Sequence, residues 1–181
     1  MEQFIEKLLP PLRKFLDLPF IFFGHSLGGL IAFELARTLR RENLPQPVAL
    51  FLSACGAPHL VNSNLPIHHL PDSGFIAELT RLNGIPQEIF RNPEAMQLIL
   101  PVLRGDFEAA ESYKLNPNAP PLACPIHAFG ALDDPRVSHD QIEGWAAHTT
   151  SAFKPHYFSG GHFFLDPNKD AIIETIVKEL A

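Results

Sequence analysis

A short apolar run that turns at once into a helical pattern constrains this chain most. Pro19–Phe23 is continuously apolar, as expected of a strand that is buried on both faces of a parallel sheet. It is followed by residues 24–28, Gly-His-Ser-Leu-Gly, and a helical spacing of apolar residues then extends over Leu27–Arg41. The sequence therefore predicts a strand, a sharp turn with Ser26 at its apex, and a helix.

The residue types at this turn indicate its chemistry. A strand-to-helix turn this tight is expected to hold Ser26 in a strained backbone conformation. We expect side chains at positions 24 and 28 to collide with neighbouring backbone, so that only Gly24 and Gly28 fit there. The Ser26 hydroxyl would lie at the carboxyl edge of the sheet, where open α/β sheets bind ligands. Ser26 is thus a candidate nucleophile, and the backbone N–H of Leu27 at the helix start is a candidate oxyanion donor.

The rest of the chain alternates strand-like and helix-like segments. Further strands are predicted at Val48–Ala54, 125–130 and 153–158. Helices are predicted at 4–16, with a kink at Pro10 and Pro11, and at 74–82, 86–104 beginning with Pro86, 138–147 and 168–180. This order indicates an α/β fold with a mostly parallel sheet and helices on both faces. We expect one domain over residues 1–181, with a helical insertion at about 57–120, called the insertion below.

A serine nucleophile needs a base, and one of the nine histidines has a local signature for that role. His162 follows the last predicted strand and two glycines, in a loop that could bring its imidazole over the sheet edge. His25 is expected to point away from Ser26. The other histidines are predicted to be ordinary surface or loop residues; they are His59, His68, His69, His127, His139, His148 and His156.

An acid that orients the base is expected in the loop after the preceding strand. That loop, residues 130–137, contains the neighbouring carboxylates Asp133 and Asp134, which spacing alone does not separate. The chain order Ser, Asp, His is that of α/β-hydrolases. Such an acid holds the imidazole in the correct tautomer and stabilises its cationic form.

Composition and charge exclude several classes of protein. The chain has 181 residues, of which 46% are hydrophobic and 19% charged, as in an ordinary globular domain. A net charge of −6 argues against nucleic acid as a partner. Neither a membrane-spanning run nor a signal-peptide pattern is present, so we expect no membrane partner and a cytoplasmic location. Cys55 and Cys124 are predicted to be buried and unpaired, and no Cys/His spacing suggests a zinc site.

Together these sites resemble the type II thioesterases of nonribosomal peptide and polyketide synthesis, which have the α/β-hydrolase fold. The resemblance is carried by residues 19–36, 100–107, 133–138 and 160–165. It implies that Ser26 is the nucleophile, His162 the base and Asp134 the orienting acid. Asp134 is favoured over Asp133 because the family's acid directly precedes a Pro-Arg-Val sequence or its equivalent.

The resemblance also implies an activity and a partner. The expected reaction is hydrolysis of acyl thioesters from the phosphopantetheine arm of a carrier protein, through an acyl-enzyme, with the insertion as a lid. No metal or cofactor is implied. Two alternatives stay open at this point: a small-ester hydrolase, and a catalytically impaired fragment that retains only carrier-protein binding.

The chain departs from the family at its beginning. Family members usually have several strands and a glycine-rich loop before the first helix found here, and that loop supplies a second oxyanion donor. We therefore expect an N-terminally incomplete domain in which the first strand, 19–23, becomes an exposed edge. Loss of one oxyanion donor is expected to slow the reaction by roughly 10²–10³-fold.

Overall fold

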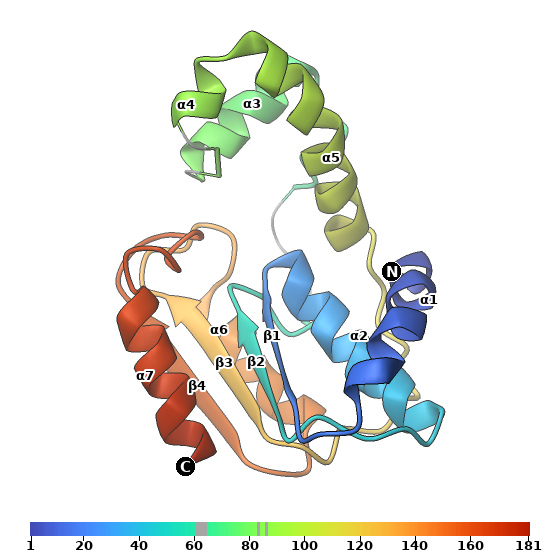
Figure 1. Ribbon diagram of the computed structural model, residues 1–181. Helices are drawn as coiled ribbons and strands as arrows, with labels where there is room; N and C mark the ends of the chain where they lie inside the picture. Colours follow the sequence, from blue (N-terminus) through green and yellow to red (C-terminus); the bar gives the residue numbers. More distant parts are fainter. Residues whose placement is uncertain (61–64, 83, 86) are drawn as a thin grey trace.

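The computed structural model describes residues 1–60, 65–82, 84–85 and 87–181 (Figure 1). Four strands form one parallel sheet in the order β1-β2-β3-β4. They are β1 (Ile21–His25), β2 (Ala49–Ser53), β3 (Ile126–Ala131) and β4 (Phe153–Phe158). Each coincides with a predicted strand to within a few residues.

Helices occupy the segments between the strands. They are α1 (Glu2–Leu12), α2 (Leu27–Arg41), α3 (Asp72–Arg81), α4 (Gln87–Phe90), α5 (Pro93–Glu111), α6 (His139–Glu143) and α7 (Lys169–Leu180), with 3-10 turns η1 (Arg13–Phe15) and η2 (Gly144–His148). α1 contains both Pro10 and Pro11 and passes directly into η1, so the helix predicted at 4–16 is present as two successive pieces.

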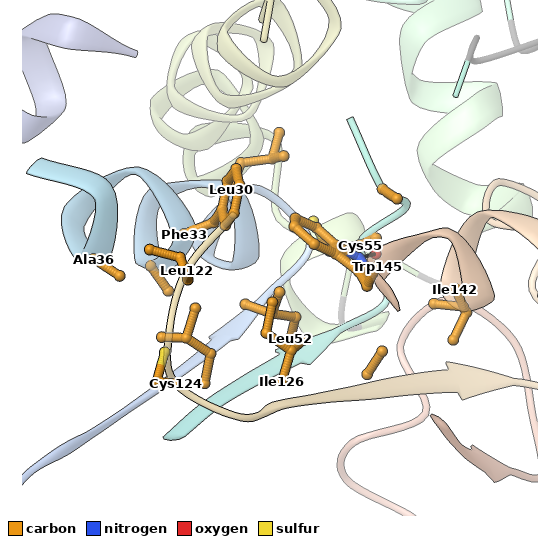
Figure 2. Packing of buried hydrophobic residues seen from close by; sticks show 14 residues of the cluster. Leu30, Phe33, Ala36, Leu52, Cys55, Leu122, Cys124, Ile126, Ile142 and Trp145 are labelled. Carbon is orange, nitrogen blue, oxygen red and sulfur yellow. Dashed lines mark hydrogen bonds between the residues drawn. The ribbon is translucent and has the colours of Figure 1, made fainter. Parts of the chain in front are cut away.

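The sheet is covered on both faces, as predicted. On one face, Phe33 of α2, Ile142 of α6 and Trp145 of η2 pack on the strands (Figure 2). The Trp145 indole N–H donates a 2.6 Å hydrogen bond to the carbonyl of Cys55. On the other face, Ile172 of α7 packs against the apolar side chains of β2 and β3. Both cysteines are buried and free, which confirms their prediction.

β1 forms one edge of the described sheet. It pairs with β2 alone, and Phe23 is 40% exposed. The expectation that this strand is buried on both faces was therefore wrong, because of its five residues only Gly24 is buried. The expected edge position, in contrast, is confirmed for the described strands.

The insertion is helical, as predicted, but its second helix differs. The structure has two helices, α4 and α5, where one was expected at 86–104, and Pro86 lies outside the described residues. The break occurs at Asn92, whose side chain accepts hydrogen bonds from two N–H groups of the first turn of α5, and Pro93 begins that helix. α5 continues past Pro101 to Glu111.

The insertion has a small core of its own beyond the carboxyl end of the sheet. Ile67, Phe75 and Leu79 are buried against side chains of α5. In Figure 1, α3 and α4 lie above the loops that follow β3 and β4. An added Cβ on Gly84, between α3 and α4, would lie 2.9 Å from the ring of Phe163, so this part of the insertion touches the loop after β4.

Candidate active site

The turn between β1 and α2 has the predicted strain. Ser26 has φ 52° and ψ −119°, a conformation that side chains rarely adopt. Its N–H donates a 2.8 Å hydrogen bond to the carbonyl of Ser53, which fixes the turn to the end of β2. A Cβ on Gly24 would lie 2.1 Å from the carbonyl oxygen of Gly28, so only glycine fits at position 24.

The prediction for Gly28 was wrong. A Cβ there would meet no described atom within 4 Å, because this position faces open space at the start of α2. The second close approach is instead at Gly29, where a Cβ would lie 2.7 Å from the Cβ of Cys55. The sequence pattern could not separate the two positions, since both are glycines at the start of the same helix.

Three of the predicted site residues form one hydrogen-bonded chain. His162 Nε2 is 3.1 Å from Ser26 Oγ, and His162 Nδ1 is 2.9 Å from Asp134 Oδ2. The side chains of His162 and Asp134 are 4% and 1% exposed. The three residues follow the carboxyl ends of β1, β3 and β4, which a parallel sheet brings to the same edge. Leu27 is the first residue of α2, directly after Ser26.

The two neighbouring carboxylates have different surroundings. Asp134 Oδ1 accepts hydrogen bonds from the N–H groups of Arg136, at 2.8 Å, and Val137, at 3.3 Å, which leaves Oδ2 for His162. Asp133 is exposed, and its own N–H donates to the carbonyl of Gly160. The structure therefore brings Asp134, not Asp133, against the histidine ring.

His25 lies inside the site, contrary to its expected orientation away from it. Its ring centroid is 5.5 Å from that of His162, and its Nδ1 is 3.0 Å from Ser53 Oγ. Its Nε2 is buried and has no hydrogen-bond partner among the described residues. Burial, followed by the nearby His162, lowers the pKa of His25 to about 4. His25 therefore adds a neutral ring to the site at pH 7, which the sequence did not indicate.

An ion pair joins the acid's loop to the insertion. Arg136 lies two residues after Asp134, and its guanidinium donates a 3.0 Å hydrogen bond to Glu111 at the end of α5. Both side chains are buried, at 9% and 5% exposed. Burial alone would raise the pKa of Glu111, but hydrogen bonds from His68 and Ile67 and the charge of Arg136 hold it below its ordinary value. A charged pair thus fixes the insertion beside Asp134.

The remaining histidines follow the sequence prediction only in part. His59, His69 and His139 are exposed, as expected. His127, on β3, is buried at 3% exposure, and His156 lies on β4. The prediction was wrong for His127, because the register of the sheet turns its side chain toward Glu179 of α7 rather than toward water. His156 is half-buried. Among the described residues, no helix is both long and apolar enough to cross a membrane.

Comparisons with known proteins place the chain in a family. A family model described as Thioesterase domain matches residues 1–180. The chain is 40% identical to the linear gramicidin dehydrogenase LgrE of Brevibacillus parabrevis, covering 99% of this chain and 68% of LgrE. It is 39% identical to the gramicidin S biosynthesis protein GrsT of Aneurinibacillus migulanus, covering 99% of this chain and 70% of GrsT.

A solved structure shows which known fold the chain shares. The type II thioesterase BorB from the borrelidin biosynthetic cluster superposes with a TM-score of 0.89 at 38% identity, covering 99% of this chain and 73% of BorB. The predicted α/β-hydrolase fold is thereby confirmed. Because the family model spans nearly the whole chain and BorB shares its fold throughout, the chain belongs to the thioesterase family.

Proposed function

We propose that this protein hydrolyses acyl thioesters, with Ser26 as nucleophile, His162 as general base and Asp134 as the acid that orients His162. The observation that carries the proposal is the continuous hydrogen-bonded chain of these three side chains in a member of the thioesterase family. A serine hydroxyl becomes an effective nucleophile when a base accepts its proton. At 3.1 Å, His162 Nε2 is within reach of the Ser26 proton.

The reaction has two halves. Ser26 Oγ attacks the acyl carbonyl carbon while its proton passes to His162 Nε2, and Asp134 stabilises the resulting imidazolium. The Leu27 N–H, at the start of α2, donates to the oxyanion that develops on the carbonyl oxygen. The C–S bond breaks, and the departing sulfur takes the proton from His162 and leaves as a thiol. A water molecule, deprotonated by His162, then attacks the acyl carbonyl carbon. The C–O bond to Ser26 breaks as Ser26 Oγ takes that proton from His162, and the free acid leaves.

The substrate class is inferred from the relatives. BorB is a type II thioesterase from a borrelidin biosynthetic cluster, and GrsT is a gramicidin S biosynthesis protein. We therefore place the acyl group on the phosphopantetheine arm of a carrier protein in nonribosomal peptide or polyketide synthesis, where its removal is an editing step. A thiolate is a better leaving group than an alkoxide, so breaking a thioester requires less help from the general acid.

The insertion acts as the lid in this proposal. It contacts the loop of His162 through Gly84 and Phe163, and the loop of Asp134 through Glu111 and Arg136. It therefore borders both loops whose residues carry the chemistry. The lid, at about residues 57–120, belongs to a single thioesterase domain over residues 1–181.

The test is acyl release from a carrier protein. The purified chain is incubated with a carrier whose phosphopantetheine arm is loaded with acetyl or a longer acyl group, and acyl loss is followed by intact-mass spectrometry. Ser26→Ala should abolish the loss. Ser151→Ala, which changes an exposed serine before β4, should leave it unchanged. Turnover of simple esters alone would indicate a small-ester hydrolase, and carrier binding by folded protein without Ser26-dependent turnover would overturn the proposal.

A further inference from the structure

A second group of metal-ligating side chains lies between the sheet and α7, apart from the group around Ser26. It consists of His127 on β3, His156 on β4 and Glu179 near the end of α7. One ligand atom from each residue lies within 4.8 Å of the other two. His127 Nδ1 is 3.5 Å from His156 Nε2 and 3.8 Å from Glu179 Oε2.

These separations are close to those of ligands around one metal ion. Zinc binds imidazole nitrogens and carboxylate oxygens at about 2.0–2.2 Å with tetrahedral angles, so neighbouring ligand atoms lie roughly 3.3–3.6 Å apart. The pair His127–His156 already has this spacing. Glu179 Oε2 is 3.8 Å from His127 Nδ1, and the three ligand atoms lie within 4.8 Å of one another, so the Glu179 side chain must move closer for all three to bind one ion. Two imidazoles and a carboxylate are also a ligand set that zinc accepts.

The sheet holds the two histidines in place. His127 pairs with Lys154 in the register of β3 and β4, and His156 pairs with Phe129, so the two histidines are diagonal neighbours on one face. The ring of Phe51 stacks on that of His127, with centroids 4.7 Å apart and planes at 14°. Two of the three ligands are therefore held on a rigid support before any ion binds.

A cation already lies beside the third ligand. The Lys154 ammonium forms an ion pair with Glu179 Oε2. The Lys154 side chain is 54% exposed, whereas that of Glu179 is 11% exposed, so the lysine can turn into water without disturbing the core. We propose that His127, His156 and Glu179 bind one divalent transition-metal ion of the zinc class, with Lys154 displaced into solvent and water completing the coordination. The ion would join β3, β4 and α7 at the end of the sheet away from Ser26.

Zinc binding by the metal-free, untagged chain tests the proposal, measured by isothermal titration calorimetry with zinc chloride and by the absorption of bound cobalt. We expect one ion per chain. His156→Gln and Glu179→Gln should each weaken binding at least about 10-fold, since each removes a direct ligand. Lys154→Met should strengthen binding, because it removes the competing ammonium ion.

A matched control comes from another close histidine pair. His59 Nδ1 and His148 Nε2 are 2.7 Å apart, so His59→Gln removes a histidine from an even closer pair elsewhere in the chain. This variant should bind zinc like the parent chain. Urea unfolding identifies any variant that fails to fold. If either His156→Gln or Glu179→Gln does not fold, the other variant alone tests the loss of a ligand. Absence of zinc binding by the parent chain, or its loss in His59→Gln with retention in His156→Gln, would overturn the proposal.

Discussion

At the carboxyl end of the sheet, Ser26, Asp134 and His162 lie on turns and loops that follow three strands. At the other end, His127 and His156 lie within strands, and Glu179 lies within a helix. Both groups are largely buried and bring histidine close to a carboxylate. The two groups differ in how visible they are in the sequence. The residues of the first group have glycine or proline close by in the chain, whereas the two histidines of the second group are brought together only by the register of β3 and β4.

The largest effect is expected at Asp134. Asp134→Asn keeps the shape of the side chain but no longer holds His162 in the tautomer that accepts the Ser26 proton, so kcat should fall by about 10⁴-fold. Asp133→Asn is the matched control, and it should change kcat by no more than about 2-fold because Asp133 is exposed. Steady-state kinetics on an acyl thioester provide the measurement.

A larger loss of kcat in Asp133→Asn than in Asp134→Asn would mean that Asp133, not Asp134, is the acid that orients His162. Zinc titration of Asp134→Asn sharpens the comparison further. Zinc binding by His127, His156 and Glu179 should be unchanged in this variant, because Asp134 follows the carboxyl end of β3 whereas His127 is near its start.

The next effect concerns the attachment of the loop of Asp134 to the insertion. Glu111→Gln removes one charge of a buried ion pair, so the free energy of unfolding should fall by about 3 kcal/mol. Glu78→Gln is the control, because its partner Arg81 is exposed, and this change should cost less than about 1 kcal/mol. Urea denaturation of both variants gives the values, and equal losses would show that the Glu111–Arg136 pair does not hold the insertion.

A smaller effect depends on pH and on His25. The folded-state pKa of His25 lies near 4, below the ordinary value of 6.5, so the unfolded chain binds a proton more readily than the folded one between these values. Its contribution to stability is therefore complete above about pH 6.5 and is lost as the pH falls toward 4. By pH 5 the loss should be about 1–2 kcal/mol.

His25→Gln should flatten the pH dependence of urea denaturation between pH 7 and 5. His69→Gln, at an exposed position, should leave that dependence as it is. If the pH dependence of the free energy of unfolding is unchanged in His25→Gln, the buried ring of His25 does not resist protonation.

The sequence predicted Ser26 and His162 because their signals are local, whereas the choice of Asp134 over Asp133 came from the family resemblance. The apolar run before Gly24, the turn at Ser26 and the two glycines before His162 are each visible within a few residues. The strands and their order around the insertion were predictable for the same reason. Periodicity and turn residues fix where an element begins and what it connects to.

What the sequence did not predict depends on contacts between distant segments. The position of His25 against His162, the pairing of Glu111 with Arg136 and the burial of His127 all arise from packing between separate elements. None of these residues has a neighbouring glycine or proline pattern that marks its partner. The split between α4 and α5 was different, because the local pair Asn92-Pro93 carries a helix-start signal that the longer apolar pattern obscured.

The smallest effect is expected at Gly28, and it tests how strictly the turn at Ser26 needs its glycines. Alanine is the better helix former, and a Cβ at Gly28 meets no described atom within 4 Å, so Gly28→Ala should stabilise the chain by about 0.5 kcal/mol. Gly29→Ala receives the same helix benefit but forces its Cβ against Cys55, and overpacking of this kind costs about 1–3 kcal/mol. The two variants should therefore shift the urea midpoint in opposite directions. A loss of stability in Gly28→Ala would mean that the turn requires glycine at position 28 for its backbone conformation, and that the local pattern had identified the constraint correctly after all.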